Sequence, residues 1–269
     1  EFILYISMLT WPVATVGWVT SIVQQAEASQ KRINVFLKKK TKIKSGNQKK
    51  KISGSIEFKN VFFKYNNSEK FIVNGMSFKI KEGDKIGIIG NIGSGKSTIL
   101  NLIARLYDIK KGNLYIDGID IKEYNINTLR NSISYVPQDS FLFSDSIIEN
   151  IKFGNEKSSF EDIYKYSSLV EIHEEIKNFN KGYETLIGER GITLSGGQRQ
   201  RLSIARALIK NSKIILFDDC FSAIDSKTQK KILENLNHLN EKKTMIFISH
   251  NISSIINCNK VLVVDKGQI

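Results

Sequence analysis

The sequence contains only two cysteines, Cys220 and Cys258, in 269 residues. A secreted protein held together by disulfides needs more of them, so this class is excluded and a reducing compartment is favoured. Neither cysteine has a second cysteine or a histidine at metal-ligand spacing, and we therefore predict no zinc site. With 41% hydrophobic and 25% charged residues, the composition is that of a globular protein and excludes a disordered or collagen-like chain.

Acidic residues are missing from one stretch, Lys31 to Lys51, which carries ten lysines and arginines. The net charge of the whole chain is +13, which alone would suggest a nucleic-acid partner. Once this stretch is set aside together with Glu1 and Glu27, residues 52–269 carry a net charge of only +5. We therefore predict no nucleic-acid partner.

Charge is also missing from Phe2 to Val23, a run of 22 residues. A helix of this length reaches about 33 Å, enough to cross the hydrocarbon core of a membrane. A signal peptide and a buried soluble helix are the alternatives, but a signal peptide starts with Met and basic residues, whereas this chain starts with Glu1. We predict a transmembrane helix, and residues 1–37 are expected to be the end of a larger membrane domain of which the chain is a fragment.

The lysine-rich residues 38–53 are predicted to be a linker on the cytoplasmic side, because positive charge marks that side of a membrane helix. They can also meet anionic membrane lipid, although a solvated linker is the simpler interpretation. The expected location is the cell (inner) membrane, with residues 54–269 in the cytoplasm.

From Ile56 onward, short apolar runs alternate with amphipathic helical patterns. The runs IEFKNVFFKY and FIVNGMSFKI alternate with period two and predict an antiparallel pair. KIGIIG, NLYIDG, SISYV, KIILFDD, TMIFISH and VLVVD are typical of buried strands. The fold class is therefore predicted to be α/β, with a mostly parallel sheet and antiparallel strands at its edge.

A glycine-rich loop follows the run KIGIIG and precedes an apolar helix. Its pattern is G-x-x-x-x-G-K-S, in the strand–loop–helix context that phosphate binding requires. Its backbone N–H groups and the helix N-terminus can surround phosphate oxygens, its lysine can reach the β- and γ-phosphates, and its serine can ligate Mg²⁺. The predicted ATP-binding residues are Gly90, Asn91, Ile92, Gly93, Ser94, Gly95, Lys96, Ser97 and Thr98.

Two acids end the apolar run IILFDD. A carboxylate at the end of such a strand can meet a metal held by the phosphate loop, so Asp218 is predicted to bind Mg²⁺. Asp219 occupies the place of a water-activating carboxylate. His250 ends the next apolar run and could position the γ-phosphate, although a lone histidine is more often structural.

The sequence LSGGQ, formed by Leu194 and the four residues Ser195, Gly196, Gly197 and Gln198, resembles the signature motif of ATP-binding-cassette (ABC) ATPases. The resemblance implies a phosphate-loop core with an antiparallel β subdomain and an inserted helical subdomain at about 139–207. It implies that Ser195–Gln198 act on a nucleotide held by a second subunit. It also implies that Tyr65 stacks on adenine, that Gln138 joins Ser97 and Asp218 at Mg²⁺, that Ser222–Asp225 cross the dimer interface, and that Asp219 and His250 flank the attacking water.

The resemblance extends to ABC exporters. A membrane helix on the same chain, the segment LFSDSIIENI, and Gly188-Glu189-Arg190-Gly191 are similar to exporter features. The chain is thus expected to be a half-transporter that pairs with a second one and drives efflux of a small molecule or lipid. Multidrug, lipid and peptide export all remain open.

Asp219 departs from the family pattern, which usually has Glu at this position. Its carboxylate is one methylene shorter, so its oxygens retreat by about 1.5 Å, and misplacement of about 1 Å can cost ~100-fold in rate. We expect a slow site here and a fast site completed by the LSGGQ of this chain in an unlike partner. The alternatives are a homodimer in which Asp219 works adequately, a regulatory half with little turnover, and a nucleic-acid-associated ABC ATPase.

Overall fold

The computed structural model describes residues 1–39, 41–188, 194–239, 242–250 and 255–269. It divides into two compact units, Glu1–Lys42 and Ile43–Ile269. The second is called the α/β unit below.

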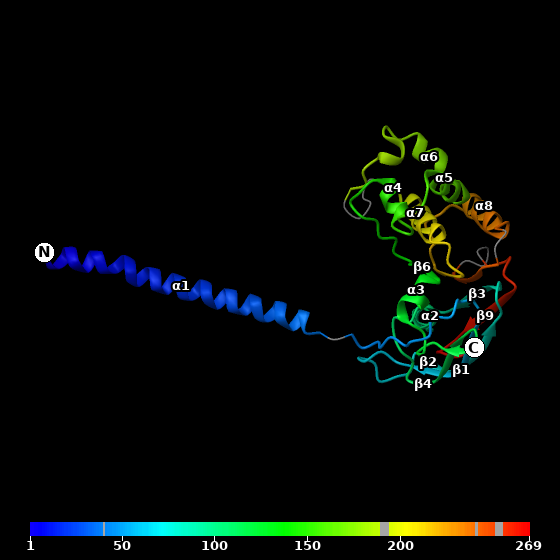
Figure 1. The fold of residues 1–269 in the computed structure, drawn as a ribbon, viewed down its shortest axis with the longest axis horizontal. Helices are drawn as coiled ribbons and strands as arrows, with labels where there is room; N and C mark the ends of the chain where they lie inside the picture. The colour runs from blue at the N-terminus through cyan, green and yellow to red at the C-terminus, as the bar shows by residue number, and fades with distance from the viewer. Residues whose placement is uncertain (40, 189–193, 240–241, 251–254) are drawn as a thin grey trace. The chain divides into compact units, whose positions relative to one another are not determined.

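The first unit is one helix, α1 (Phe2–Leu37), which runs through Pro12 without ending. Four hydroxyl side chains donate hydrogen bonds to the carbonyl one turn earlier, so their polar groups are satisfied within the helix; they are Ser7, Thr10, Thr15 and Thr20. Among the described residues, α1 is the helix whose length and composition suffice to cross a membrane (Figure 1).

The α/β unit contains two sheets. The strands of the four-stranded sheet, in the order β2-β1-β4-β5, are β1 (Ile56–Phe63), β2 (Val73–Ile80), β4 (Lys111–Ile116) and β5 (Ile119–Asp120), and all neighbours are antiparallel. The strands of the five-stranded sheet, in the order β6-β7-β8-β3-β9, are β3 (Lys85–Gly90), β6 (Ile133–Val136), β7 (Ile214–Asp218), β8 (Thr244–Ile248) and β9 (Lys260–Val264), and all neighbours are parallel.

The fold class predicted from the sequence is confirmed, with one difference in the sheets. The antiparallel β subdomain that the family resemblance implies is confirmed as a sheet of its own, whereas the sequence pattern placed these strands at the edge of the parallel sheet. The first four residues of NLYIDG belong to this antiparallel sheet as part of β4. Strand β4 pairs with β1, with Ile116 opposite Ile56 and Leu114 opposite Phe58. Its short apolar run could not be distinguished by pattern from the buried parallel strands.

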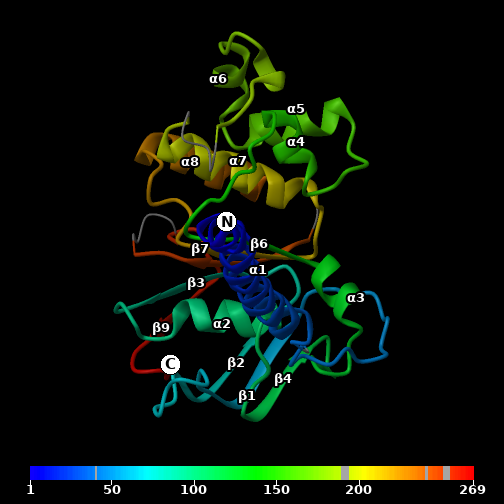
Figure 2. The ribbon, with the colours of Figure 1, turned by 90° about the vertical axis from the view of Figure 1, so that its left-hand side faces the viewer.

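Alternate residues of the parallel strands enter two different hydrophobic cores. Leu216 and Ile246 face a core shared with the antiparallel sheet and helix α2 (Lys96–Ile103), which Figure 2 shows between the two sheets. Phe217 and Phe247 face the opposite core, where their rings stack with centroids 4.6 Å apart. Burial on both faces explains why these strands are apolar throughout.

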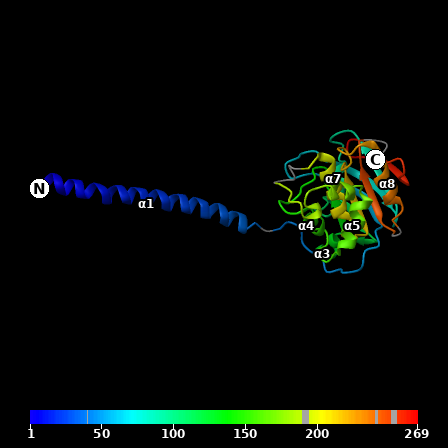
Figure 3. The same ribbon diagram turned by 90° about the horizontal axis from the view of Figure 1, so that it is seen from above.

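The remaining helices are α3 (Ile126–Asn131), α4 (Ile147–Lys152), α5 (Phe160–Leu169), α6 (His173–Lys177), α7 (Gly196–Ile209) and α8 (Ser226–Asn237), with a 3₁₀ turn at Gly182–Glu184. Helices α4 and α5 both pack against α7, and Figure 3 shows the three grouped together. Helices α4, α5 and α6 and most of α7 lie within the stretch at about 139–207 for which the sequence predicts an inserted helical subdomain.

Part of the predicted lysine-rich linker is attached to the α/β unit. Gly46 N–H donates to the carbonyl of Tyr124, and Gln48 forms a β-bridge with the same residue. The buried guanidinium of Arg105 donates to the carbonyl of Lys44 at 2.7 Å. The backbone of residues 44–48 is therefore held in place, while the side chains of Lys44, Lys49, Lys50 and Lys51 are exposed.

We expect Ile246→Ala to lower the free energy of unfolding by about 2–5 kcal/mol, because Ile246 is fully buried in a central strand and truncation leaves a cavity. Val263→Ala is the matched control: Val263 is 58% exposed on the edge strand β9, and its truncation should change stability by less than about 0.5 kcal/mol. Urea denaturation measures both, and equal effects would contradict this account of the core.

Candidate functional site

The glycine-rich loop leaves strand β3 at Gly90 and enters helix α2 at Lys96. Gly90 has a φ of 154°, and a Cβ there would lie 2.0 Å from the carbonyl oxygen of Val264, so only glycine fits. Gly95 caps the helix with a φ of 105°. The hydroxyl of Ser94 is buried in the loop without a hydrogen-bond partner, which fits a loop that receives an external oxygen ligand.

Lys96 supplies the positive charge of this loop. Its Nζ donates to the carbonyl oxygens of Gly90 and Asn91 at 2.8 Å each, and the residue is only 6% exposed. Burial lowers its pKa, although the nearby carboxylates of Asp219 and Asp218 oppose this shift. The loop therefore holds an ammonium group at its centre, where phosphate oxygens can replace the carbonyl groups as partners.

Asp218 lies at the carboxyl end of β7 beside the start of helix α2. The hydroxyl of Ser97 donates to its Oδ1 at 2.8 Å, and the hydroxyl of Tyr135 donates to its Oδ2 at 2.8 Å. Burial and the charge of Asp218 raise the pKa of Tyr135, so the phenol remains a donor. A carboxylate and a hydroxyl at hydrogen-bond distance are the hard oxygen ligands that suit Mg²⁺.

Asp219 follows in a left-handed conformation, with a φ of 47° that aspartate tolerates better than most residues. The amide of Gln138 donates to its Oδ2 at 3.4 Å. A cavity of about 390 Å³ joins these two residues to the glycine-rich loop, and it is called the loop cavity below. Its lining residues are Ile72, Ile92, Gly93, Gly95, Lys96, Ser97, Thr98, Gln138, Asp218, Asp219, Ile248 and His250.

The loop cavity thus contains most of the residues to which the sequence assigns phosphate, metal and water contacts, from four separate parts of the chain. Gly90 and Asn91 accept hydrogen bonds from Lys96 through their carbonyl oxygens. Ser94 lies in the same loop with its hydroxyl buried and without a hydrogen-bond partner. Their roles toward ATP remain predictions.

Tyr65 lies outside the lining of the loop cavity. Its hydroxyl lies 3.2 Å from that of Thr98, and its ring packs edge-on against Phe63 and Tyr107, each with centroids 5.0 Å apart. The ring is half-buried beside the first turn of helix α2, and its stacking on adenine remains a prediction.

The four signature residues also lie outside the lining of the loop cavity and open helix α7. Ser195 and Gln198 form a reciprocal capping box: the Ser195 hydroxyl accepts from the Gln198 N–H, and Gln198 Oε1 accepts from the Ser195 N–H. The remaining N–H groups at this helix start can bind an anion. Gly196 and Gly197 keep the turn close to Ala223, since a Cβ on Gly197 would lie 2.9 Å from its carbonyl oxygen.

The segment Ser222–Asp225 is tied to the same helix. Gln200 of α7 donates to the hydroxyl of Ser222 and accepts from the N–H of Ala223. Asp225 then caps helix α8 by accepting from Thr228 N–H. The segment after Asp219 and the signature helix are therefore joined directly.

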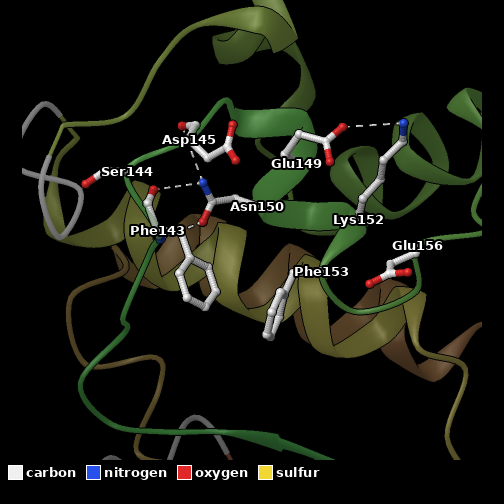
Figure 4. Close-up of a pocket in the computed structure, with 8 residues that line it drawn as sticks. All are labelled: Phe143, Ser144, Asp145, Glu149, Asn150, Lys152, Phe153 and Glu156. Carbon is white, nitrogen blue, oxygen red and sulfur yellow. Dashed lines mark hydrogen bonds and ion pairs between the residues drawn. The ribbon is translucent and has the colours of Figure 1, made fainter.

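A second cavity, of about 520 Å³, lies along the segment LFSDSIIENI (Figure 4). The rings of Phe143 and Phe153 lie beside each other with centroids 4.6 Å apart, and the side chain of Asn150 holds the backbone of Phe143 from both sides. Of the other segment that resembles exporters, Gly188 is described but Glu189, Arg190 and Gly191 lie outside the described residues.

Two residues at these sites were not found from the sequence. Tyr135 contacts Asp218 because β6 and β7 are neighbours, with Tyr135 opposite Leu216. The order of the strands in the sheet cannot be predicted from hydrophobic patterns, so this contact was not expected. Glu175 of α6 binds both Gln198 and Arg201 of α7, at distances of 2.6–3.1 Å. In the sequence Glu175 lies among other polar residues of a helix, and nothing in that pattern indicates a contact with Gln198 or Arg201.

We expect Glu175→Gln to lower the free energy of unfolding by about 1 kcal/mol at pH 7. Burial opposes ionisation of Glu175, but the hydrogen bonds from Arg201 and Gln198 outweigh it and lower the pKa of the carboxyl. A lowered folded-state pKa adds stability above the unfolded-state value, and this is lost as the pH falls below about 4. In urea denaturation the deficit of the variant should therefore stay near its pH 7 value down to about pH 5 and shrink as the pH falls below about 4.

Glu174→Gln is the control for this prediction, because the Glu174 side chain is 81% exposed and its effect should be small at every pH. A deficit for Glu175→Gln that does not depend on pH would contradict the ion-pair explanation.

Comparison with known proteins places this site in a family. The family model described as ABC transporter matches residues 73–222. Over 276 aligned positions the chain is 41% identical to the multidrug resistance-like ATP-binding protein MdlA of Buchnera aphidicola subsp. Baizongia pistaciae, covering 100% of this chain and 47% of that protein. It is also 41% identical to the ATP-dependent lipid A-core flippase of Haemophilus influenzae, covering 80% of this chain and 37% of that protein.

The solved structure of a bacterial Atm1-family ABC exporter with ATP bound is similar as well, with 34% sequence identity and a TM-score of 0.86. The match covers 98% of this chain and 47% of that one. The chain therefore spans about half the length, or less, of the proteins it matches. The family model matches more than half of the residues of this chain, and the phosphate loop and the acids at the end of β7 line one cavity. The chain therefore belongs to the ABC transporter family.

Proposed function

We propose that this chain is the ATP-binding and ATP-hydrolysing part of an ABC exporter half-transporter. The observation that carries the proposal is the loop cavity, which joins Lys96, Ser97 and Asp218 to Asp219, Gln138 and His250. The similarity to the solved structure of an Atm1-family ABC exporter with ATP bound supports the proposal.

In this proposal the loop N–H groups and Lys96 bind the phosphates, and Tyr65 stacks on adenine. Ser97, Asp218 and Gln138 hold Mg²⁺, which neutralises charge on the transferring phosphate when bound. Asp219 and His250 orient the attacking water and the γ-phosphate. The signature residues Ser195–Gln198 serve a nucleotide held by a second half-transporter.

The proposed assembly is a pair of half-transporters in a cell membrane, with the α/β unit in the cytoplasm. Residues 1–37 would be the end of the transmembrane domain, residues 38–53 the linker, and residues 54–269 the nucleotide-binding domain with its helical subdomain at about 139–207. ATP would stabilise the closed pair of cassettes and hydrolysis would release it, so that differential affinity for the closed state drives efflux. The curated relatives are named for multidrug resistance and lipid A-core flipping, which supports a small molecule or lipid as cargo.

We propose further that the pair is unlike and that this chain builds the slower site. The support is Asp219, whose shorter side chain places the carboxylate about 1.5 Å further from the water it would orient than a glutamate would on the same backbone. A regulatory half with little turnover of its own is the alternative function that the same residue favours.

Lys96→Ala should abolish ATP binding, because the variant loses the ammonium at the centre of the loop. The test is equilibrium binding of a fluorescent ATP analogue to the full-length subunit. Lys85→Ala is the matched control, since it removes a lysine from the start of β3, the strand that leads into the loop, and this variant should bind the analogue normally. Unchanged binding by Lys96→Ala would overturn the proposed function.

Asp219→Glu should raise steady-state ATP hydrolysis by the subunit alone at least about tenfold if the native site is slow. Lys96→Ala combined with Asp219→Glu should remove this activity, which assigns it to this site. If the wild-type subunit already turns over at about 1 s⁻¹ or faster, the asymmetric pair is wrong and a homodimer replaces it.

A further inference from the structure

The carboxylate of Asp218 has a hydrogen bond on each oxygen. Ser97 Oγ donates to Oδ1 and Tyr135 OH donates to Oδ2, both at 2.8 Å, and Asp218 is only 7% exposed. The two donors come from different elements of the fold, Ser97 from the first turn of α2 and Tyr135 from β6. The carboxylate plane is therefore fixed by two contacts that do not depend on each other.

Tyr135 reaches this position because of strand pairing. It lies opposite Leu216 in the parallel pair of β6 and β7, two residues before Asp218, and its long side chain spans the remaining distance. The phenol oxygen also lies 3.4 Å from Asn101 Oδ1, but it has a single proton to donate. The shorter bond to a charged acceptor is the stronger one, so this proton belongs to Asp218.

We propose that Tyr135 is a positioning residue for the divalent cation: by holding Oδ2, it leaves Oδ1, beside the Ser97 hydroxyl, as the oxygen presented to the metal. This inference rests on the proposed function. Carboxylates that ligate metals are themselves held by outer hydrogen bonds, and removing such a partner typically weakens metal affinity about 10–100-fold. Without the phenol, the carboxylate can rotate and offer either oxygen, and that freedom is lost again when the cation binds.

The test is Tyr135→Phe in the full-length chain, which removes the hydroxyl and keeps the ring. The probe is Mn²⁺, whose free concentration is followed by electron paramagnetic resonance in the presence of a saturating non-hydrolysable ATP analogue. We expect the Kd of Mn²⁺ to rise about tenfold. Binding of the ATP analogue in EDTA should stay within twofold of the wild type, because Tyr135 acts on the metal ligand and not on the phosphate loop.

Tyr124→Phe is the matched control. The hydroxyl of this fully buried tyrosine donates to the carbonyl of Ile116 at 3.1 Å, within the core under the antiparallel sheet, and Tyr124 does not line the loop cavity. It should leave the Mn²⁺ affinity unchanged even if it lowers the melting temperature. A purely structural role for Tyr135 predicts the same result for both variants, and that result would overturn the inference.

A second variant keeps the test decisive. Tyr135→Leu should weaken Mn²⁺ binding at least as much as Tyr135→Phe, and it serves in place of that variant if Tyr135→Phe does not fold. If the wild-type chain binds neither the ATP analogue nor Mn²⁺, the proposed function itself is wrong. If it binds both and the Tyr135 variants bind Mn²⁺ as tightly, only the role of Tyr135 is wrong.

Discussion

Parallel strand pairing is the constraint on which the site depends. Because β6, β7, β8 and β3 run in the same direction, their carboxyl ends meet at one edge of the sheet. The ends of these four strands and the segments that follow them contain Gln138, Asp218 with Asp219, His250 and the glycine-rich loop. Residues more than a hundred positions apart thus meet in one cavity without any long irregular excursion of the chain. The antiparallel sheet and the helices cover the two faces of this sheet and leave that edge open.

The sequence predicted the parts of the site that sit on local patterns. The glycine-rich loop, Lys96 and Ser97 follow from a strand–loop–helix pattern, and Asp218 follows from an apolar run that ends in an acid. Ser195 was found through its motif, and the structure adds the reciprocal cap with Gln198 that fixes the start of α7. Each of these signals lies within about ten residues of chain, which is the range over which pattern reasoning works.

Contacts between distant segments could not be predicted in this way. Tyr135 reaches Asp218 only because β6 lies next to β7, and Glu175 holds Gln198 only because α6 packs near the start of α7. The placement of NLYIDG is a similar case, since it has the apolar content of a buried parallel strand but pairs with β1 in the antiparallel sheet. In each case the decisive fact is which elements become neighbours, and that depends on the packing of the whole α/β unit.

The link from Gln200 to Ser222 and Ala223 has a consequence for how such a protein can change over time. It fastens the helix that would serve a partner's nucleotide to the segment that follows Asp219 in its own site. In the pair of subunits proposed above, each chain would then carry parts of both catalytic centres on segments that are hydrogen-bonded to each other. Loss of either copy would remove both centres at once.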